Sequence, residues 1–253
     1  MTIYPDDTKI WGVDVSFYQD DNDTPRGIDF NEMKEQGASF VFIRAGQNTW
    51  VDPDFIANWT AAREAGLPRG AYWFLDARID GRLQGGLFRS LLEGDWGELP
   101  PVVDYEHAVR VPVTKGKNGR TYSEWRYNTP VQLHTFLSKL QSPRTPMIYT
   151  GYYYWAEHGS DHADFGVLPL WIAAYGDEPR VPFPWKKWTF WQFTDNGPGK
   201  VLGAESHRID LNYFQGTQAD FDEMVQRWPV PVPHTHEFRC VCDICGIEKA
   251  PNP

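Results

Sequence analysis

The sequence contains little cysteine, little positive charge and no long hydrophobic run. Its three cysteines all fall within the last fourteen residues, so the rest of the chain has no disulfide framework. No apolar run approaches membrane-spanning length, and residues 1–9 contain neither the basic nor the apolar region of a secretory signal peptide. With 24 basic against 34 acidic residues and a formal charge of −10, nucleic acid and anionic membranes are disfavoured as partners.

What the sequence does contain is enough apolar material for one large core. The 253 residues are 41% hydrophobic, which suits a single α/β barrel with a small appendage. Aromatic residues make up 15% of the chain, and 12 of them are tryptophan. Aromatic faces pack well against the apolar faces of sugar rings. The aromatic content is therefore compatible with a carbohydrate groove as well as with an aromatic-rich core.

Apolar strands alternate with amphipathic helices in the first half of the chain, and bare strands follow in the second half. Strands are predicted at 10–15, 39–45, 70–75, 100–106, 146–150, 170–173, 190–193 and 209–212. Helices are predicted after the N-cap candidates Asp29 and Asp54, over 83–92, over 129–140, within 151–159 and over 219–228, with an exposed loop at 114–120. This order predicts an irregular (β/α) barrel.

Four carboxylates stand at or near the ends of predicted strands. The strand that begins at residues 100–103 runs into Asp104 and Glu106, which alternation places on one face. Two carboxylates so close raise the pKa of one member, and glycoside hydrolysis requires such a pair. Asp14 ends the first strand and Asp210 lies near the eighth, so closure of a barrel sets them side by side at the catalytic rim. For Asp14 a structural role stays open, in which its carboxylate accepts backbone amides at the start of a helix.

An ordered set of short motifs extends this pattern over most of the chain. The motifs are Gly12-Val13-Asp14-Val15-Ser16, Phe40-Val41-Phe42-Ile43-Arg44-Ala45, Val51-Asp52-Pro53, Gly70-Ala71-Tyr72-Trp73-Phe74, Val103-Asp104-Tyr105-Glu106, Met147-Ile148-Tyr149-Thr150, Leu170-Trp171-Ile172-Ala173, Trp191-Gln192-Phe193 and Ile209-Asp210-Leu211-Asn212. Together they resemble glycoside hydrolase family 25, the lysozymes of the Chalaropsis type, which are widespread among bacteriophage endolysins. The resemblance runs from about Gly12 to Phe214.

The resemblance implies a flattened (β/α)5(β)3 barrel that needs no cofactor for catalysis. It implies cleavage of the β-1,4 bond between N-acetylmuramic acid and N-acetylglucosamine in peptidoglycan. Glu106 then corresponds to the general acid/base, and Asp104 to the residue that orients or stabilises the substrate N-acetyl group as it assists attack at the anomeric carbon. Asp14 and Asp210 line the same pocket. Residues at positions that bind substrate are Tyr72, Tyr149, Trp171, Gln192 and Arg44, although barrel packing is an equally good role for Trp171.

Two motifs depart from the family pattern. Tyr72-Trp73-Phe74 stands where the family often has Tyr-His-Phe, and Arg44-Ala45-Gly46-Gln47-Asn48 stands where it commonly has Lys-Ala-Thr-Glu-Gly.

Two alternative functions are considered for the same strand-end acids. A chitinase-like hydrolase also ends its fourth strand in Asp-x-Glu, but with a longer Asp-rich run than residues 100–103 supply. A non-catalytic glycan-binding barrel would typically have lost the acid.

The C-terminal region is predicted to be separate from a catalytic barrel at 1–228. Residues 229–233 alternate proline with valine and are predicted to be an extended linker. In the tail at 234–253, the candidate zinc ligands are His234, His236, Cys240, Cys242 and Cys245. A segment this short cannot build a core, so zinc would explain how it folds. The alternative is a disordered tail with reactive thiols, because a second Cys-x-x-Cys pair is absent.

The expected setting of the activity follows from the same resemblance. Without a recognisable signal peptide, the chain is expected to be a phage endolysin that stays in the host cytoplasm until a holin opens the membrane. It would then act on the cell wall as a monomer, with peptidoglycan as its partner and no membrane attachment. The absence of barrel cysteines fits a reducing compartment.

Overall fold

The computed structural model describes residues 2–20, 27–108, 110–114, 121–125, 129–159 and 163–226. The main sheet contains β1 (Trp11–Val15), β2 (Val41–Gln47), β3 (Trp50–Val51), β4 (Arg69–Phe74), β5 (Val102–Asp104), β8 (Met147–Gly151), β9 (Leu170–Ala173), β10 (Phe190–Pro198) and β11 (Arg208–Phe214). The helices are α1 (Phe30–Glu35), α2 (Phe55–Glu64), α3 (Gly81–Leu92), α4 (Thr129–Leu140), α5 (Tyr152–His158) and α6 (Gln218–Gln226).

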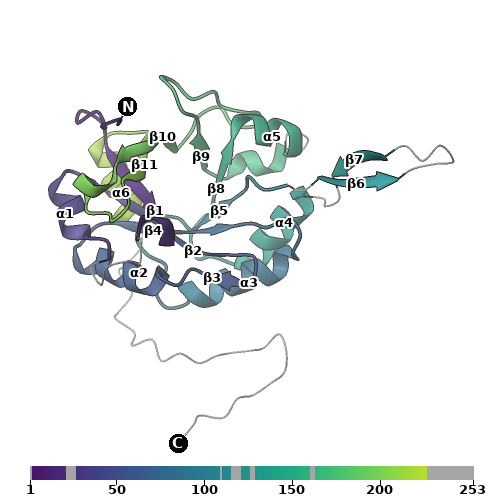
Figure 1. The fold of residues 1–253 in the computed structure, drawn as a ribbon, viewed down its shortest axis with the longest axis horizontal. Coiled ribbons are helices and arrows are strands. Elements are labelled where there is room, and N and C mark those ends of the chain that lie inside the picture. The colour runs from purple at the N-terminus through teal and green to yellow at the C-terminus, as the bar shows by residue number, and fades with distance from the viewer. Residues whose placement is uncertain are drawn as a thin grey trace, which may run out of the picture.

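The main sheet closes into a barrel (Figure 1). Its strand order is β1-β11-β10-β9-β8-β5-β4-β2-β3, and β1 also pairs with β2. β3 is the hairpin partner of β2, so the other eight of these nine strands form the ring. Neighbouring strands from β1 round to β10 are parallel, and β11 is antiparallel to both β10 and β1. The five helices α1 to α5 follow the first five ring strands, so the predicted (β/α)5(β)3 barrel is confirmed.

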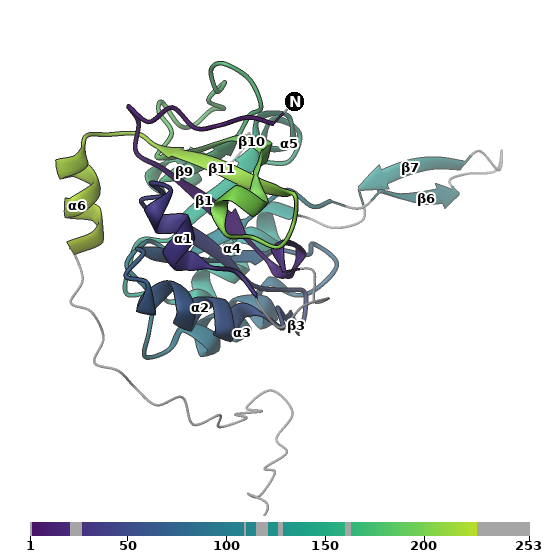
Figure 2. The ribbon, with the colours of Figure 1, turned by 60° about the vertical axis from the view of Figure 1, so that its left-hand side comes forward.

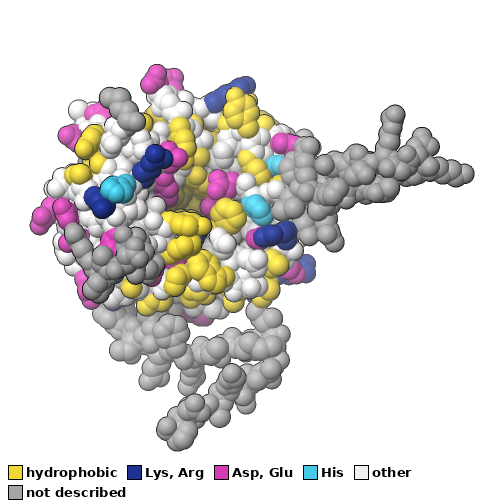
Figure 3. Space-filling view, viewed as in Figure 1, with side chains coloured by type: hydrophobic (Ala, Val, Ile, Leu, Met, Phe, Trp, Pro, Cys, Tyr) yellow, Lys and Arg dark blue, Asp and Glu magenta, His cyan; other side chains and the backbone are white. Residues whose placement is uncertain are grey.

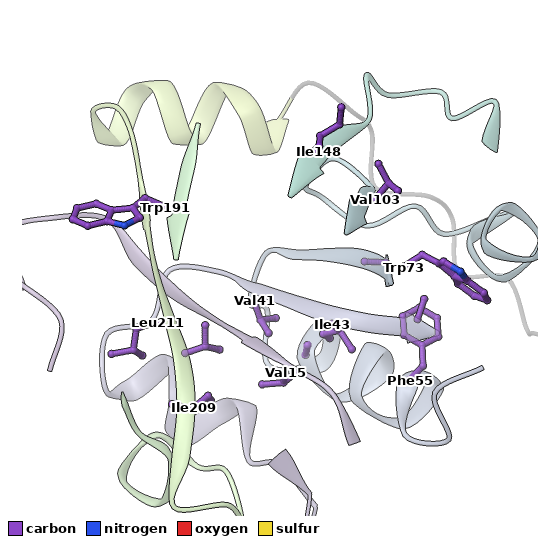
Figure 4. Packing of buried hydrophobic residues seen from close by; sticks show 14 of the residues in the cluster. Val15, Val41, Ile43, Phe55, Trp73, Val103, Ile148, Trp191, Ile209 and Leu211 are labelled. Carbon is purple, nitrogen blue, oxygen red and sulfur yellow. The ribbon is translucent and has the colours of Figure 1, made fainter. Parts of the chain in front are cut away.

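Alternation along each strand divides the apolar residues into two sets. Val41, Ile43 and Trp73 belong to the set that packs between the strands and the helices, where Phe55 of α2 meets them (Figure 4). The second set fills the barrel and consists of Phe40, Phe42, Leu99, Val102, Met147, Tyr149, Trp171, Phe190, Phe214 and Phe221. Period-two alternation thus turns one face of each strand to the helices and the other to the barrel axis.

Two glycines make room for the large rings inside the barrel. A Cβ atom at Gly12 would lie 2.3 Å from the carbonyl oxygen of Phe40, and one at Gly70 would lie 2.4 Å from the ring of Phe42. Both glycines occupy inward positions of their strands. Their lack of a side chain lets the Phe42 ring stack on Trp171 with centroids 4.5 Å apart, and this stack forms the floor beneath the acidic rim.

Two local features differ from the sequence-based predictions, and a third prediction is confirmed. A hairpin of β6 (Arg110–Thr114) and β7 (Thr121–Trp125) was not predicted, and it projects from the body (Figures 1 and 2). Its strands flank the loop predicted at 114–120, of which residues 115–120 lie outside the described residues. Asp54 makes no side-chain cap of α2, because Asp52 instead accepts the Asp54 backbone amide at 3.0 Å. The Asp29 cap of α1 is confirmed, with its carboxylate accepting two amides.

The linker at 229–233 and the tail at 234–253 lie outside the described residues. So do the candidate zinc ligands His234, His236, Cys240, Cys242 and Cys245. Among the helices that the structure describes, none is both long and apolar enough to cross a membrane.

Candidate active site

The four predicted carboxylates meet in one pocket of about 240 Å³ at the carboxyl ends of the parallel strands. Its lining residues are Asp14, Tyr72, Asp104, Glu106, Tyr149, Trp171, Tyr175, Gln192, Asp195 and Asp210. Figure 3 shows acidic side chains in a hollow near the middle of one face, with hydrophobic side chains beside it. A larger hollow of about 620 Å³ contains Lys9 and Glu35, but it gathers no comparable set of carboxylates.

Strand pairing places Asp14 beside Asp210. The two residues are partners in the antiparallel β1–β11 register, as closure of the barrel predicted. No backbone amide of a described residue donates to Asp14. Its Oδ2 instead accepts Nε2 of Gln192 at 2.9 Å and Nδ2 of Asn212 at 2.8 Å. Both amides are themselves oriented, because Tyr149 and Trp171 donate to their carbonyl oxygens.

The hydrogen bonds around Asp14 and Asp210 separate their roles. Burial raises the pKa of Asp14, while hydrogen bonds from Asn212, Gln192 and Asp210 lower it. Burial and the charge of Asp14 raise the pKa of Asp210 to about 9. Asp14 is therefore the carboxylate that receives three donors, and Asp210 is the acid that retains its proton and donates to it.

The second pair of carboxylates lies on the adjoining part of the rim. β5 ends at Asp104, so Glu106 belongs to the loop beyond the strand and not to the strand itself. Burial, then the charges of Glu106 and Asp14, raise the pKa of Asp104 well above its usual range. Although Glu106 is exposed at the pocket mouth, desolvation and the charge of Asp14 raise its pKa as well. The pair consequently keeps a proton at a pH where isolated carboxyl groups have lost theirs.

One oxygen of Asp104 is left without a protein partner. The residue is 6% exposed, and its Oδ1 has no hydrogen-bond donor among the described residues. A buried acceptor without a donor costs about 1–3 kcal/mol. Asp104 is one of the residues that line the pocket, so a substrate N–H group that enters it would approach the carboxyl group that lacks this hydrogen bond.

Eight predicted site residues line this pocket, and Arg44 does not. They are Asp14, Tyr72, Asp104, Glu106, Tyr149, Trp171, Gln192 and Asp210. Arg44 is 6% exposed and forms an ion pair with Asp52 at 2.8 Å. Its charge still reaches the pocket, where it lowers the pKa of Asp104 against the larger effect of burial. Trp171 both packs in the barrel and lines the pocket.

Sequence reasoning missed Tyr175 and Asp195. Tyr175 follows β9 by two residues and donates to Oε1 of Gln192 at 3.1 Å, so attention to strand ends could have found it. Asp195 lies within β10, where the pairing with β11 shifts register after Gln192 and again after Thr194. Such irregularities break the alternation of side chains, so no strand pattern identifies Asp195. No His, Cys, Asp and Glu group suited to a metal ion occurs in the part of the chain that the structure describes.

Comparison with known proteins agrees with this geometry. The family model described as "Glycosyl hydrolases family 25" matches residues 13–201. Lysozyme M1 of Streptomyces globisporus is 32% identical over 227 residues, covering 86% of this chain and 72% of that protein. A bacterial lysozyme from Streptomyces coelicolor superimposes with a TM-score of 0.69 at 27% identity, covering 88% of this chain and 99% of that one.

A second solved structure has the same fold. The muramidase from Trichobolus zukalii superimposes with a TM-score of 0.66 at 26% identity, covering 87% of this chain and 100% of that chain. The matched region of the family model contains Asp14, Asp104 and Glu106, which the structure places around one pocket. The chain therefore belongs to glycosyl hydrolase family 25 and is a glycoside hydrolase.

Proposed function

We propose that this chain is a lysozyme that cleaves the β-1,4 bond from N-acetylmuramic acid to N-acetylglucosamine in peptidoglycan, with retention of configuration. The observation that carries the proposal is the buried, unpartnered Oδ1 of Asp104 in the pocket that also contains Glu106. A retaining hydrolase that uses the substrate N-acetyl group needs a carboxyl group to protonate the leaving oxygen. It also needs an acceptor that holds the acetamido N–H.

In the first step, Glu106 transfers its proton to the glycosidic oxygen as the bond from that oxygen to the anomeric carbon breaks. The acetamido oxygen of the same sugar attacks the anomeric carbon and forms a five-membered ring. Asp104 accepts the acetamido N–H, and its negative charge stabilises the positive charge that develops on the ring. Both pKa values are raised, so the pair retains a shared proton above the usual carboxyl range, and this step uses the state in which Glu106 carries that proton and Asp104 is charged.

In the second step, water attacks the anomeric carbon and the ring opens. Glu106, now a carboxylate, takes the proton of that water and returns to its acid form. Two displacements at one carbon restore the original configuration. The side chains of Tyr149 and Trp171 form the wall against which the sugar packs, and Asp14 with Asp210 provides a rigid polar rim.

Mass spectrometry of digested peptidoglycan tests the reaction. We expect new reducing ends on N-acetylmuramic acid. New reducing ends on N-acetylglucosamine, as a chitinase-like cleavage would give, refute the proposal, and so does the absence of any cleavage.

Glu106→Gln should lower kcat by ~100-fold or more while the melting temperature stays unchanged, because the amide has no proton to transfer. Asp104→Asn should also impair turnover severely, because an amide cannot supply the negative charge.

Structural zinc in the tail is part of the same proposal. It rests on the sequence, where His234, His236, Cys240, Cys242 and Cys245 supply more than the four ligands that a structural zinc ion takes. Catalysis would not involve this metal, since the proposed roles all belong to carboxylates of the barrel. Elemental analysis of the full chain tests it, as set out in the Discussion.

Phage-induced host lysis after release by a holin stays a prediction from the sequence, as does the monomeric state. A turbidity trace in a susceptible host, with and without a co-expressed holin, tests the setting. Lysis only with the holin is expected, and prompt lysis without it contradicts the prediction. Size-exclusion chromatography of the purified chain tests the oligomeric state.

A further inference from the structure

Exposed aromatic side chains gather on the same rim as the acidic pocket, at the corner between β1 and the β2–β3 hairpin. Tyr18 is 67% exposed and Trp50 is 42% exposed, and Phe17 lies between them. The ring centroid of Phe17 is 4.0 Å from that of Tyr18 and 5.4 Å from that of Trp50. These three residues are called the aromatic platform below.

The platform is built on the side chain of Arg44. Its guanidinium lies 4.5 Å from the ring centroid of Phe17, 5.3 Å from that of Tyr18 and 5.5 Å from that of Trp50. Arg44 is only 6% exposed, so it supports the three rings from the buried side. Cation–π contacts of this kind are stronger when they are desolvated.

Buried hydrogen bonds hold the platform rigid. Oδ2 of Asp52 accepts both Nε of Arg44 at 2.8 Å and the backbone amide of Phe17 at 3.1 Å. Ser16 and Gln19 form a capping box around the short 3-10 helix η1 (Phe17–Gln19), which contains Tyr18. A ligand that stacks on these rings would lose little free energy in ordering them.

Chain connections and strand register place the platform next to the acidic pocket on the same rim. Phe17 follows the pocket residue Asp14 by only three positions, and Arg44 is paired in register with the pocket residue Tyr72. In the ring of strands, β9 lies opposite β2, and the pocket residue Tyr175 follows β9. The rim thus presents aromatic side chains on opposite sides of the carboxylates, along a line that crosses the barrel mouth.

Charge decides what kind of polymer can lie on the platform. Asp52 neutralises Arg44, and carboxylates of Asp20 and Asp52 are close enough to raise the pKa of Asp54. The neighbourhood is therefore uncharged or negative, which disfavours anionic wall polymers. Aromatic faces whose only neighbouring cation among the described residues is paired with a carboxylate suit the apolar faces of neutral sugar rings.

We infer that the aromatic platform is a second sugar-binding site, which holds the glycan chain of peptidoglycan where it leaves the acidic pocket. The inference rests on the proposed function for the identity of the glycan. A pocket of about 240 Å³ is smaller than the ~300–1,000 Å³ typical of pockets that enclose a whole ligand. A polymer held there continues over the rim, and the rings of Tyr18 and Trp50 lie beside that path.

The experiment measures binding of soluble glycan strands freed of their peptides, in a Glu106→Gln background so that nothing is cleaved. Trp50→Ala should weaken strand binding by about threefold to tenfold, the range expected for one aromatic contact. Adding Tyr18→Ala should weaken it further, and Tyr18→Phe should leave it unchanged because the stacking ring remains. Binding of the free disaccharide, which occupies only the pocket, should not change in any variant.

Phe183→Ala is the matched control, since Phe183 is 65% exposed and lines no part of the pocket. In the active background, Trp50→Ala should raise KM for strands with kcat unchanged, and circular dichroism should show an unaltered fold. Strand affinity that is the same with and without Trp50 overturns the inference. Trp50-dependent binding of a polyglycerol phosphate that weakens with salt also overturns it. Failure of the Glu106→Gln protein to bind strands at all would instead count against the proposed function.

Discussion

At the residue scale, the Asp14–Asp210 pair shows how neighbours assign the protonation of two identical side chains. Asp14 receives hydrogen bonds from Gln192 and Asn212, whereas the pKa of Asp210 is raised to about 9 by burial and by the charge of Asp14. A folded-state pKa above the unfolded value of 3.8 means that the folded protein binds the extra proton. Stability is therefore present at low pH and is lost as the pH rises towards 9.

Asp210→Asn tests this assignment. The amide can still donate a hydrogen bond to Asp14 but has no proton to lose, so the variant should melt at a temperature higher than the wild type at pH 8, by roughly 2 °C or more. At pH 4 the two proteins should melt alike. Thermal melts at both pH values provide the measurement, with the exposed Asp177→Asn as a control that should melt like the wild type. An equal pH dependence in Asp210→Asn and wild type would contradict the assignment.

At the element scale, Arg69 at the start of β4 ties together α2, β4 and the segment before β5. It is completely buried, donates to the carbonyl of Trp59 and to Oδ1 of Asp95, both at 2.9 Å, and pairs with Glu98 at 3.3 Å. Its guanidinium also lies 4.2 Å from the Trp59 ring centroid. The catalytic pocket lies at the other end of β4, so this cluster contributes to stability without touching the chemistry.

Arg69→Met should lower the free energy of unfolding by about 3–5 kcal/mol, because it leaves the Asp95 charge buried without its main partner. The control is Arg63→Ala, whose side chain is 39% exposed and pairs with the same Asp95 at 3.4 Å; it should cost less than about 1 kcal/mol. Urea unfolding measures both. Unchanged stability in Arg69→Met would show that the cluster is dispensable. Because the cluster lies away from the pocket, kcat of the folded variant should equal that of the wild type.

Element prediction succeeded where burial controls the residue pattern, and it failed where it does not. The barrel strands are apolar because one face packs on helices and the other on the barrel interior. β6 contains Pro112, which counts against a strand, and β3 has only two residues, both exposed. No core selects the residues of β3, so this strand leaves little trace in the sequence.

At the scale of the whole molecule, the barrel ends with α6. Phe221 packs against Phe40 and Phe214 with ring centroids 5.8 Å and 5.3 Å apart, and the carbonyl of Met224 accepts Nη2 of Arg144 at 2.8 Å. These contacts cover the end of the barrel opposite the catalytic rim. A chain cut at residue 228, the domain boundary proposed from the sequence, would therefore retain all of α6 and its described contacts.

Truncation after Trp228 should leave hydrolysis of soluble fragments unchanged and should shift the melting temperature by less than about 2 °C, since it removes no barrel contact. Full-length protein should contain about one zinc ion per chain and the truncated protein none. The comparison variant ends at Gln215, removes α6 and should be unstable because Phe40 and Phe214 become exposed. Loss of activity after truncation at Trp228, or a metal-free full chain prepared without chelator, would contradict these expectations.

The sequence by itself determined the barrel, its alternation and the rim on which the carboxylates stand, because these depend on periodicity and on strand order. Only the tertiary structure decided the state of each carboxylate. Asp14 takes its hydrogen bonds from residues 178 and 198 positions away, and the platform joins Tyr18 to Trp50 through Arg44. A pKa is set by burial and by neighbouring charges and donors. In this protein those neighbours are brought together only when β1 closes the barrel between β2 and β11.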